Sequence, residues 1–393
     1  MKIKFNKKMF DKNKQYIIAV SGGPDSVFLL DYFVQNISKN IIIATVDYCK
    51  RKGSDFDFNL VKSYANKNNL KFLGLKCTKN VYGQYKQYKN FQEQARKIRY
   101  DFFNKILKDC NLQTGVIVAH NLTDNIETFL IQKERKTVVE HYGLNETSYY
   151  YNHNLENNNQ LKVFRPMLNV KRETIIKYLE KHKIAYAIDE SNAESNYLRN
   201  YIRNNVLKTK NYKQLLKSIL KSNEELMKIK NTYKNLLGKT SFNINLYNNL
   251  SLLAKPMFIY SFIKEKNMEK LLVDKKKKFV LEIVKQLDQE KHNVLISLGL
   301  NYYFCKNYKD IHIIKIDDND VYNKLDESKI HYKTNDRNIF TKLNYKKVKL
   351  NKIIMKSKIP LLEIINGYVI YDKKGNVIDF SNNIKKAMLN KYL

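Results

Sequence analysis

The sequence predicts an α/β fold with a doubly wound, mostly parallel sheet, followed by a small helical domain and a small α+β C-terminal domain. With 393 residues, the chain is too long for one ordinary hydrophobic core. Its first 200 residues alternate short β-branched runs with helical stretches, as a parallel sheet with crossover helices requires. After about residue 205, Lys-rich helical stretches replace this alternation, and short strand-like runs follow them.

The N-terminal half supplies strands and helices in turn. Strand-sized apolar runs predict strands at residues 16–20, 41–46, 70–75 and 115–119. Apolar residues at helical spacing predict helices at residues 27–34, 59–67, 91–107, 123–132 and 171–182. The polar, Asn-rich segment 149–160 is expected to be a surface loop. Open sheets of this type bind ligands at the carboxyl ends of their strands, so the site is expected in the loops after the first, second and fourth strands.

The C-terminal half has a different pattern. Residues 211–237 and 250–290 are rich in Lys and carry apolar residues at helical spacing, which predicts helices. The acidic, polar residues 317–326 are typical of a linker. Beyond them, turn signals at 366–367 and 374–375 separate short strand-like runs, which indicates a small α+β module.

The net charge favours a polyanionic partner. The chain has 72 Lys and Arg against 38 Asp and Glu, a net charge of +34. Each phosphate that such residues neutralise releases condensed counterions, which drives binding to nucleic acid. Apolar residues make up 43% of the chain, so the charge does not belong to a disordered basic tail. A genome poor in G and C would also enrich Lys, Asn, Ile and Tyr, so charge alone does not establish the partner.

The cysteines and the apolar segments exclude several classes of protein. Cys49, Cys77, Cys110 and Cys305 are far apart in sequence and form no C-x-x-C, and no His stands at metal-ligand spacing. This pattern argues against a zinc site and against a disulfide framework. No apolar run near the N-terminus suits a signal peptide, and the longest runs are strand-sized. We expect a soluble, cytoplasmic protein.

The strongest local signal is a Gly-rich turn between the first strand and the first helix, Ser21-Gly22-Gly23-Pro24-Asp25-Ser26. Glycines let the backbone approach a phosphate closely, and the amides of a helix N-terminus supply positive potential. Neither G-x-x-x-x-G-K-[ST] nor G-x-G-x-x-G occurs in the chain, which argues against a Walker loop and a dinucleotide site. The alternative is an ordinary tight turn with Ser21 or Asp25 as the N-cap of the helix.

Carboxylates follow two further strands. Asp47 ends the second strand, where it could face a nucleotide or start a turn. After the fourth strand, Asp124 and Glu127 are three residues apart on one helix face, and His120 precedes them. Such a group can bind Mg²⁺, recognise an ammonium group or act as a base. The alternative is a capping box with Thr123 or Asp124 as the N-cap.

Arginine is scarce and concentrated in the first half of the chain. Eight of the nine arginines precede residue 204. Most of them form three pairs in the sequence, Arg96/Arg99, Arg165/Arg172 and Arg199/Arg203. The planar guanidinium fork suits phosphates and carboxylates, so the pairs favour phosphate or RNA contacts, although surface salt bridges would explain any one of them.

The motif SGGPDS in this setting resembles the signature of the PP-loop ATP pyrophosphatases, which have an adenine nucleotide alpha hydrolase-like fold and cleave ATP between its α- and β-phosphates. Four further motifs are similar to those of tRNA(Ile)-lysidine synthetases: A-R-x-x-R-Y at 95–100, A-H-x-x-x-D-x-x-E-T at 119–128, R-P-M-L at 165–168 and D-x-S-N…R-N-x-I-R at 189–203. There are also departures from the family pattern. Tyr48-Cys49 stands where the family often has His-Gly, and Thr123 and Asn125 stand where it often has Asp and Gln.

The resemblance implies three domains and a reaction. A PP-loop ATP-binding catalytic domain is expected at 1–208, a helical tRNA-binding domain at 209–320 and a small α+β tRNA-binding domain at 321–393. The implied enzyme joins free lysine to carbon 2 of the wobble cytidine of the CAU-anticodon isoleucine tRNA. It would use ATP, which becomes AMP and pyrophosphate through an adenylated cytidine, and Mg²⁺. The sequence leaves its oligomeric state open, with a homodimer as one alternative.

The resemblance also implies roles for the candidate residues. Residues 21–26 and Asp47 would hold ATP, and Asp25 and Asp124 would hold Mg²⁺. Asp124, Glu127 or His120 would accept the proton of lysine or hold its ammonium group. The residues expected to contact lysine or tRNA are Arg96, Arg99, Asp124, Glu127, Arg165, Arg199 and Arg203.

Two other functions remain open from the sequence. A tRNA thiolase of the same superfamily would use the same adenylation but needs reactive cysteines to carry sulfur. A non-catalytic RNA-binding protein with a vestigial loop would share the charge and the fold.

Overall fold

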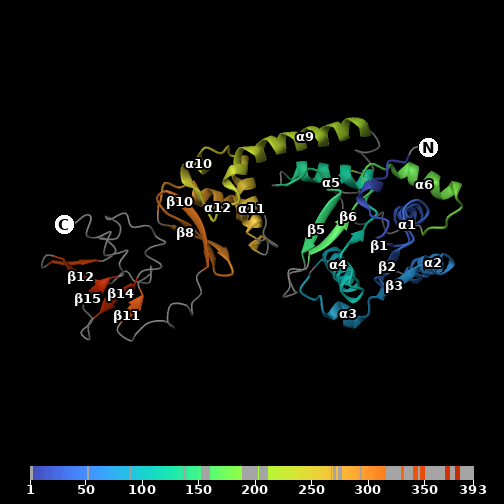
Figure 1. Cartoon of the computed structure of the whole chain (residues 1–393), viewed down its shortest axis with the longest axis horizontal. Coiled ribbons are helices and arrows are strands. Elements are labelled where there is room, and N and C mark those ends of the chain that lie inside the picture. Colours follow the sequence, from blue (N-terminus) through green and yellow to red (C-terminus); the bar gives the residue numbers. More distant parts are fainter. Residues whose placement is uncertain are drawn as a thin grey trace. The chain divides into compact units, whose positions relative to one another are not determined.

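The computed structural model divides the chain into two compact units, Met1–Glu224 and Glu225–Leu393, each of which is described by itself (Figure 1). The structure describes residues 3–50, 53–88, 90–135, 139–151, 160–187, 202, 211–266, 268, 271–272, 277–292, 294–315, 329–331, 340–343, 346–349, 368–371 and 377–380. The predicted linker at 317–326 lies outside these residues.

The first unit contains a six-stranded sheet with strand order β3-β2-β1-β4-β6-β5 (Figure 1). Its strands are β1 (Tyr16–Ala19), β2 (Ile41–Asp47), β3 (Lys71–Lys76), β4 (Val116–Ile117), β5 (Thr147–Tyr151) and β6 (Gln160–Phe164). All neighbours pair in parallel except β5, the antiparallel edge strand. The chain adds β2 and β3 on one side of β1 and β4 and β6 on the other, so the strand order reverses between β1 and β4.

Helices cover both faces of this sheet, which confirms the predicted doubly wound fold. The helices of this part of the chain are α1 (Pro24–Asn36), α2 (Ser54–Lys67), α3 (Lys79–Gly83), α4 (Phe91–Asp109), α5 (Leu122–Glu134) and α6 (Arg172–Lys181), of which α1, α2, α4 and α6 pack on the sheet. Ile18 of β1 packs in one core cluster with residues of α1, α2 and α6. Ile17, its neighbour, packs in a second cluster with residues of α4. Successive side chains of a strand point to opposite faces, so an apolar run such as residues 16–20 is buried on both sides.

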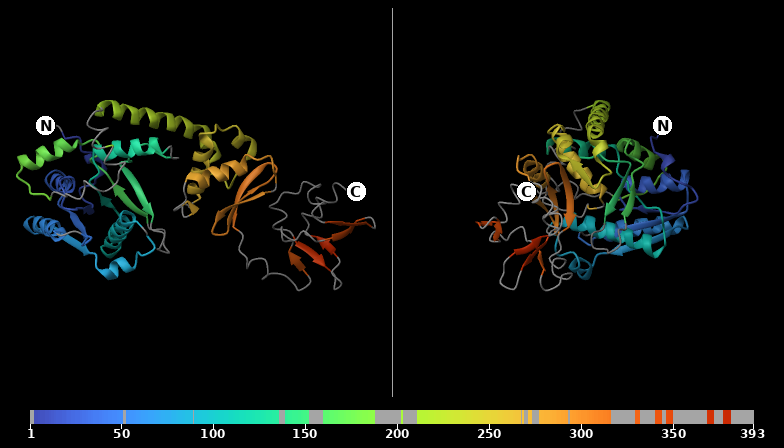
Figure 2. Two further views of the ribbon diagram at one scale, coloured as in Figure 1. Left: turned by 180° about the vertical axis from the view of Figure 1, so that it is seen from behind. Right: turned by 60° about the vertical axis from the view of Figure 1, so that its left-hand side comes forward.

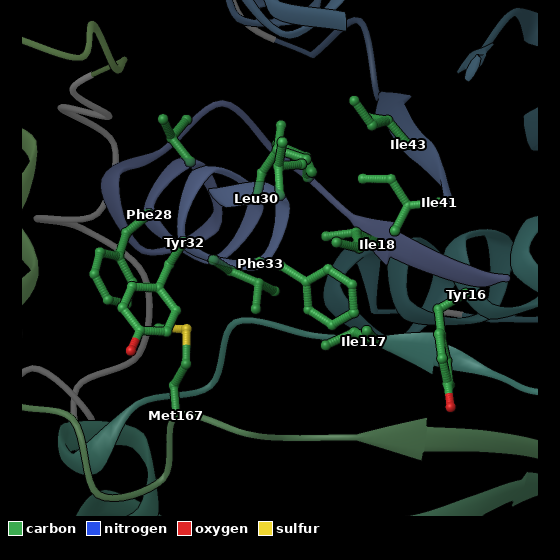
Figure 3. Close-up of a cluster of buried hydrophobic side chains, with 14 of the residues drawn as sticks. Tyr16, Ile18, Phe28, Leu30, Tyr32, Phe33, Ile41, Ile43, Ile117 and Met167 are labelled. Atoms are coloured by element: carbon green, nitrogen blue, oxygen red, sulfur yellow. The ribbon is translucent and has the colours of Figure 1, made fainter. Parts of the chain in front are cut away.

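The first core cluster is rich in aromatic side chains. Figure 3 shows Phe33 of α1 near Ile18 and Ile117 of the sheet, and Phe28 beside Tyr32. The rings of Phe33 and Tyr16 meet edge to face with centroids 6.3 Å apart. This packing holds α1 against the sheet.

One sequence prediction in this unit is wrong in part. The segment expected to be a loop at 149–160 begins within β5, because Thr147–Tyr151 pair with Gln160–Phe164 of β6. The ring of Tyr150 stacks on Tyr100 of α4 at 4.3 Å between centroids, so aromatic packing outweighs the polar composition. Residues 152–159 lie outside the described residues.

The helix α9 (Tyr212–Tyr233) begins in the first unit and crosses the boundary between the two units. Its Leu215 and Ile219 pack in a cluster with Ile126 and Phe129 of α5. Asn223 donates a hydrogen bond to the Tyr142 carbonyl oxygen at 3.0 Å. These contacts hold α5 against α9 along an apolar face that includes its first residue, Leu122.

The second unit contains α11 (Ala254–Glu265) and α12 (Lys277–Leu287), both within the helical stretch predicted at 250–290, and the short helix α10 (Ile244–Asn248), which the sequence did not predict. The sequence did not predict the four-stranded antiparallel sheet, in the order β7 (Ser241–Asn243), β10 (Asp310–Lys315), β9 (Tyr302–Lys306) and β8 (Val294–Gly299). Phe242, Phe258 and Phe304 join the helices to the sheet in an aromatic core. Buried Lys306 donates to the Leu287 carbonyl at the end of α12, at 2.7 Å.

The C-terminal strands form two small antiparallel sheets (Figure 2). One contains β11 (Lys329–His331), β14 (Tyr368–Tyr371) and β15 (Val377–Phe380), and the other contains β12 (Phe340–Leu343) and β13 (Lys346–Lys349). The predicted turn at 374–375 lies between β14 and β15 in sequence. Among the helices that the structure describes, none is both long enough and apolar enough to cross a membrane.

Candidate active site

A cavity of about 940 Å³ opens at the carboxyl ends of β1, β2 and β4, where the sequence predicts the site. This volume is near the upper end of the range for small-molecule sites, about 300–1,000 Å³. The polar and aromatic side chains that line it include Ser21, Asp25, Ser26, Thr45, Asp47, Tyr48, Cys49, Lys50, Asp57, Phe91, Arg96, Arg99, His120, Asn121, Asp124 and Arg172. All of them belong to the first unit.

The Gly-rich turn connects β1 to α1 in a conformation that requires glycine. Gly22 has φ +86°, and a Cβ at this position would lie 3.0 Å from the Cβ of Asp57. The Ser26 hydroxyl donates to the Gly23 carbonyl oxygen at 2.9 Å and accepts from the Ser21 N–H at 3.1 Å. The turn is therefore held by its own hydrogen bonds.

The alternative interpretation of this turn, with Ser21 or Asp25 as N-cap, is wrong. Gly23 is the N-cap of α1, Pro24 follows it, and no described side chain caps the helix. The 13-residue helix therefore presents its N-terminal amides and their positive potential to the cavity. This arrangement suits a phosphate group.

Asn121 connects the two predicted metal-binding carboxylates. It is 2% exposed, and its Nδ2 donates to Asp25 Oδ1 at 3.0 Å. Its backbone N–H donates to Asp124 Oδ2 at 2.9 Å, and its own Oδ1 accepts from the N–H groups of Thr123 and Asp124. The predicted alternative of a capping box is therefore observed, but with Asn121 as the N-cap instead of Thr123 or Asp124. Asp124 caps α5 and lines the cavity at once.

His120 lies beside Asn121 and is oriented by a buried arginine. Arg165 Nε donates to His120 Nδ1 at 3.2 Å, and Arg165 Nη1 donates to the Asn145 carbonyl and the Ser148 hydroxyl. Because Nδ1 accepts this bond, a neutral His120 carries its proton on Nε2. Arg165 is 6% exposed, and burial lowers the pKa of its guanidinium group.

Only some of the remaining predicted residues line the cavity. Arg96 and Arg99 of α4 both line the cavity, and the Arg96 guanidinium lies 4.7 Å from the ring centre of Tyr100. Glu127 is 3% exposed and is not part of the cavity lining, although it follows Asp124 by one helical turn. Arg199 and Arg203 lie outside the described residues.

Asp47 fits both of its predicted interpretations. It lines the cavity at the end of β2, and its Oδ1 accepts from the Cys49 N–H at 2.8 Å, as in a turn. Cys49 has φ 52°, in the left-handed region that favours glycine. The Tyr48 side chain points toward α4, where its hydroxyl donates to the Ala95 carbonyl at 2.9 Å. Burial raises the pKa of Tyr48, although the nearby Arg99 partly opposes this.

The cysteines near the cavity are poor nucleophiles. Cys49 follows β2 and Cys77 follows β3, and the Cys77 N–H donates to the Asp47 carbonyl at 2.8 Å. Burial raises the pKa of Cys77 to about 12. Desolvation and the Asp47 carboxylate raise the pKa of Cys49. Both thiols therefore stay protonated at neutral pH, and the reactive species of a cysteine is its thiolate.

Two residues that line the cavity, Thr45 and Asp57, were not among the residues predicted from the sequence. Thr45 of β2 is 3% exposed, and its hydroxyl has no hydrogen-bond partner among the described residues. Asp57 of α2 lies opposite Gly22. In the sequence, a Thr within a strand and an Asp in the first turn of a helix look ordinary, because both are common there.

Comparisons with known proteins show which family the chain belongs to. The PP-loop domain family matches residues 1–210. A tRNA(Ile)-lysidine synthase of Mycoplasma mycoides subsp. mycoides SC is 36% identical to this chain, covering 95% of the chain and 90% of that protein. Those of Mesoplasma florum and Mycoplasmopsis pulmonis are 35% and 32% identical, each covering 76% of this chain, with 73% and 99% of their own lengths aligned. The chain therefore belongs to the tRNA(Ile)-lysidine synthase family.

Proposed function

We infer that this protein is an ATP-dependent ligase that forms lysidine on tRNA(Ile). The observation that carries this function is the similarity to tRNA(Ile)-lysidine synthases, which extends over 95% of the chain, together with the PP-loop domain at residues 1–210. The cavity at the carboxyl ends of the strands supports it, because it combines a phosphate-binding turn, carboxylates and arginines.

The proposed reaction has two steps. The carbonyl oxygen on carbon 2 of the wobble cytidine attacks the α-phosphorus of ATP, and pyrophosphate leaves with the electrons of the broken P–O bond. The ε-amine of free lysine, after losing a proton, then attacks carbon 2. AMP leaves with the former carbonyl oxygen, so the new C–N bond replaces the C–O bond. The specific target is the tRNA with the CAU anticodon, whose modified base reads AUA.

The turn at residues 21–26 would hold the phosphates of ATP. Its backbone amides and the N-terminus of α1 face the cavity, and the Ser21 and Ser26 hydroxyl groups lie 3.3 Å apart beside them. Preorganised donors of this kind stabilise the charge that develops on the departing pyrophosphate.

Asp25 and Asp124 would hold Mg²⁺ with the ATP phosphates. Both carboxylates line one cavity and both accept a hydrogen bond from Asn121. Among the described residues, no group of three or more His, Cys, Asp or Glu suits a metal ion. Mg²⁺ commonly uses one or two protein carboxylates together with substrate phosphates. When bound, the metal would neutralise charge on these phosphates.

Asp124, more than His120 or Glu127, would receive the proton of lysine or hold its ammonium group. His120 lines the cavity and accepts from Arg165 through Nδ1, so a neutral imidazole would act as a donor through Nε2. A donor suits the oxygen that leaves with AMP better than it suits an ammonium group. Glu127 is buried outside the lining, whereas the Asp124 carboxylate is part of it.

Arg96 or Arg99 would bind the lysine carboxylate, because both exposed guanidinium groups line the same cavity. The Lys-rich second unit would bind the tRNA through its phosphate backbone and recognise its overall shape. In this proposal, residues 1–208 act as the catalytic domain, and 209–320 and 321–393 act as tRNA-binding domains.

The function is tested by incubating the full chain with ATP, labelled lysine and tRNA(Ile) carrying CAU. The control substrate is elongator methionine tRNA, which has the same anticodon. We expect label in the first tRNA only. A folded protein that leaves both tRNAs unlabelled would refute lysidine formation.

A tRNA thiolase is not favoured by the chemistry of the cavity. Cys49 lines the cavity and Cys77 is buried after β3, and both thiols have raised pKa values, so neither is ready to carry sulfur.

A further inference from the structure

A group of aromatic and basic side chains borders the cavity on the side of α3 and α4, and the proposed reaction does not use it. We call Tyr48, Lys50, Tyr82 and Phe91 the aromatic rim. Tyr48, Lys50 and Phe91 line the cavity, and Tyr82 belongs to α3. Three separate segments of the chain therefore contribute to one surface.

The rim is held together by specific contacts. The Nζ of Lys50 lies 4.5 Å from the ring centre of Tyr82 and 5.7 Å from that of Phe91. The rings of Tyr48 and Phe91 meet edge to face at 5.9 Å and 82°. The Tyr82 hydroxyl donates to the Tyr48 carbonyl oxygen at 2.7 Å. These contacts keep the aromatic rings in fixed positions beside a positive charge.

Phe91 remains accessible at this position. It is 43% exposed although it lines the cavity, whereas Phe103, also of α4 and of the lining, is 1% exposed. An aromatic ring that stays open to solvent next to a cation has the chemistry of a platform for a nucleobase. The ring face stacks with the base, and the ammonium group contacts the phosphate backbone.

We propose that the aromatic rim stacks a nucleobase of the tRNA anticodon loop as it enters the cavity. The proposal rests on the inferred function, because it assumes a tRNA substrate. A tRNA base is favoured over the adenine of ATP for two reasons. The exposed ring lies where a large substrate can reach it, and a cavity of about 940 Å³ has room for a base in addition to ATP.

The test compares Phe91→Ala with Phe91→Trp and with Phe56→Ala. Trp keeps a stacking face, and Phe56 is an equally simple control because it is 63% exposed on α2 and outside the cavity lining. For each full-length variant, the measurements are the dissociation constants of tRNA(Ile) and ATP, each alone, and the KM for tRNA in lysine incorporation. Thermal unfolding checks that each variant is folded.

We expect Phe91→Ala to weaken tRNA binding and raise the KM for tRNA about tenfold, the low-to-middle range for one stacked base. The dissociation constant of ATP stays within about twofold, and Phe91→Trp and Phe56→Ala remain close to the unaltered protein. Unchanged tRNA affinity in Phe91→Ala overturns the proposal, and so does an equal loss in Phe56→Ala. Weaker ATP binding in Phe91→Ala also overturns it, because the rim would then hold adenine.

The proposed function and the rim fail in different ways. If the unaltered protein incorporates no lysine, the function is refuted, and the tRNA dissociation constants still test the rim. If the unaltered protein incorporates lysine and Phe91→Ala binds tRNA normally, only the rim is refuted.

Discussion

Gly22 is the position at which one methyl group should damage the Gly-rich turn most. Its φ of +86° is unfavourable for alanine, and the new Cβ would lie 3.0 Å from the Asp57 Cβ and 3.2 Å from the Asp57 carbonyl oxygen. Both contacts are with the Asp57 backbone or its first side-chain carbon, so a side-chain rotation does not relieve them. Gly22→Ala should therefore be destabilising through strain and through crowding.

Gly53→Ala separates these two effects. Gly53 has φ +84°, nearly the same as Gly22, but a Cβ there meets no atom within 4 Å. It should cost about 1 kcal/mol, from the left-handed backbone alone. Gly22→Ala should cost about 1 kcal/mol for the backbone and about 1–3 kcal/mol more for crowding.

The assay is urea denaturation of the full chain, following the transition that added ATP shifts to higher urea. ATP affinity is measured in parallel. Gly22→Ala should lose more free energy of unfolding than Gly53→Ala and should bind ATP at least tenfold more weakly. Equal losses in both measurements would refute the reasoning, because crowding against Asp57 would then contribute nothing.

The other predictions concern the residues around the carboxylates and the thiols. Asn121→Ala should lower the free energy of unfolding by about 1–2 kcal/mol, because α5 loses its N-cap, and should reduce lysine incorporation. Asn121→Asp should retain more stability but lose as much activity, because it places a third carboxylate beside Asp25. Equal losses of stability in the two variants would contradict this. Arg165→Gln should lower kcat with little change in tRNA affinity, because Arg165 orients His120 from a buried position; a loss confined to tRNA affinity would assign it to RNA contact. Replacing both Cys49 and Cys77 by Ser should leave lysine incorporation within about twofold, as expected for thiols that stay protonated, and complete loss would favour thiolation.

The N-terminal sheet could be predicted because its signals are local and agree with one another. Runs such as residues 41–46 are apolar on both faces, as only a strand buried on both sides requires. The antiparallel sheet of the second unit was missed because its strands are half-buried and carry Lys and Tyr among the apolar residues. In β9, Tyr302 is only partly buried and Lys306 is fully buried by capping the end of α12, a long-range contact that no local pattern reveals.

Some residues of the candidate site could likewise be predicted from the sequence, and others could not. The turn at residues 21–26 is a contiguous motif with a physical purpose, so its position at the cavity could be predicted. Asn121 could have been found, because an Asn three residues before an Asp is the sequence pattern of a capping box. Arg165 and Glu127 could not be placed, because burial depends on tertiary packing; Arg165, for example, donates to the Asn145 carbonyl and to Ser148 of β5. The same holds for Lys50 and Phe91, which meet only in the folded chain.

The central claim, that the cavity around the Gly-rich turn activates tRNA with ATP for attack by lysine, is tested most directly by stoichiometry. With tRNA(Ile) carrying CAU, the release of AMP and the incorporation of labelled lysine are measured in the same reaction, for the unaltered protein and for Asp25→Ala. We expect one AMP for each lysine incorporated, and loss of both in Asp25→Ala with tRNA affinity largely retained. AMP release that continues in Asp25→Ala, or lysine incorporation without AMP, would contradict it.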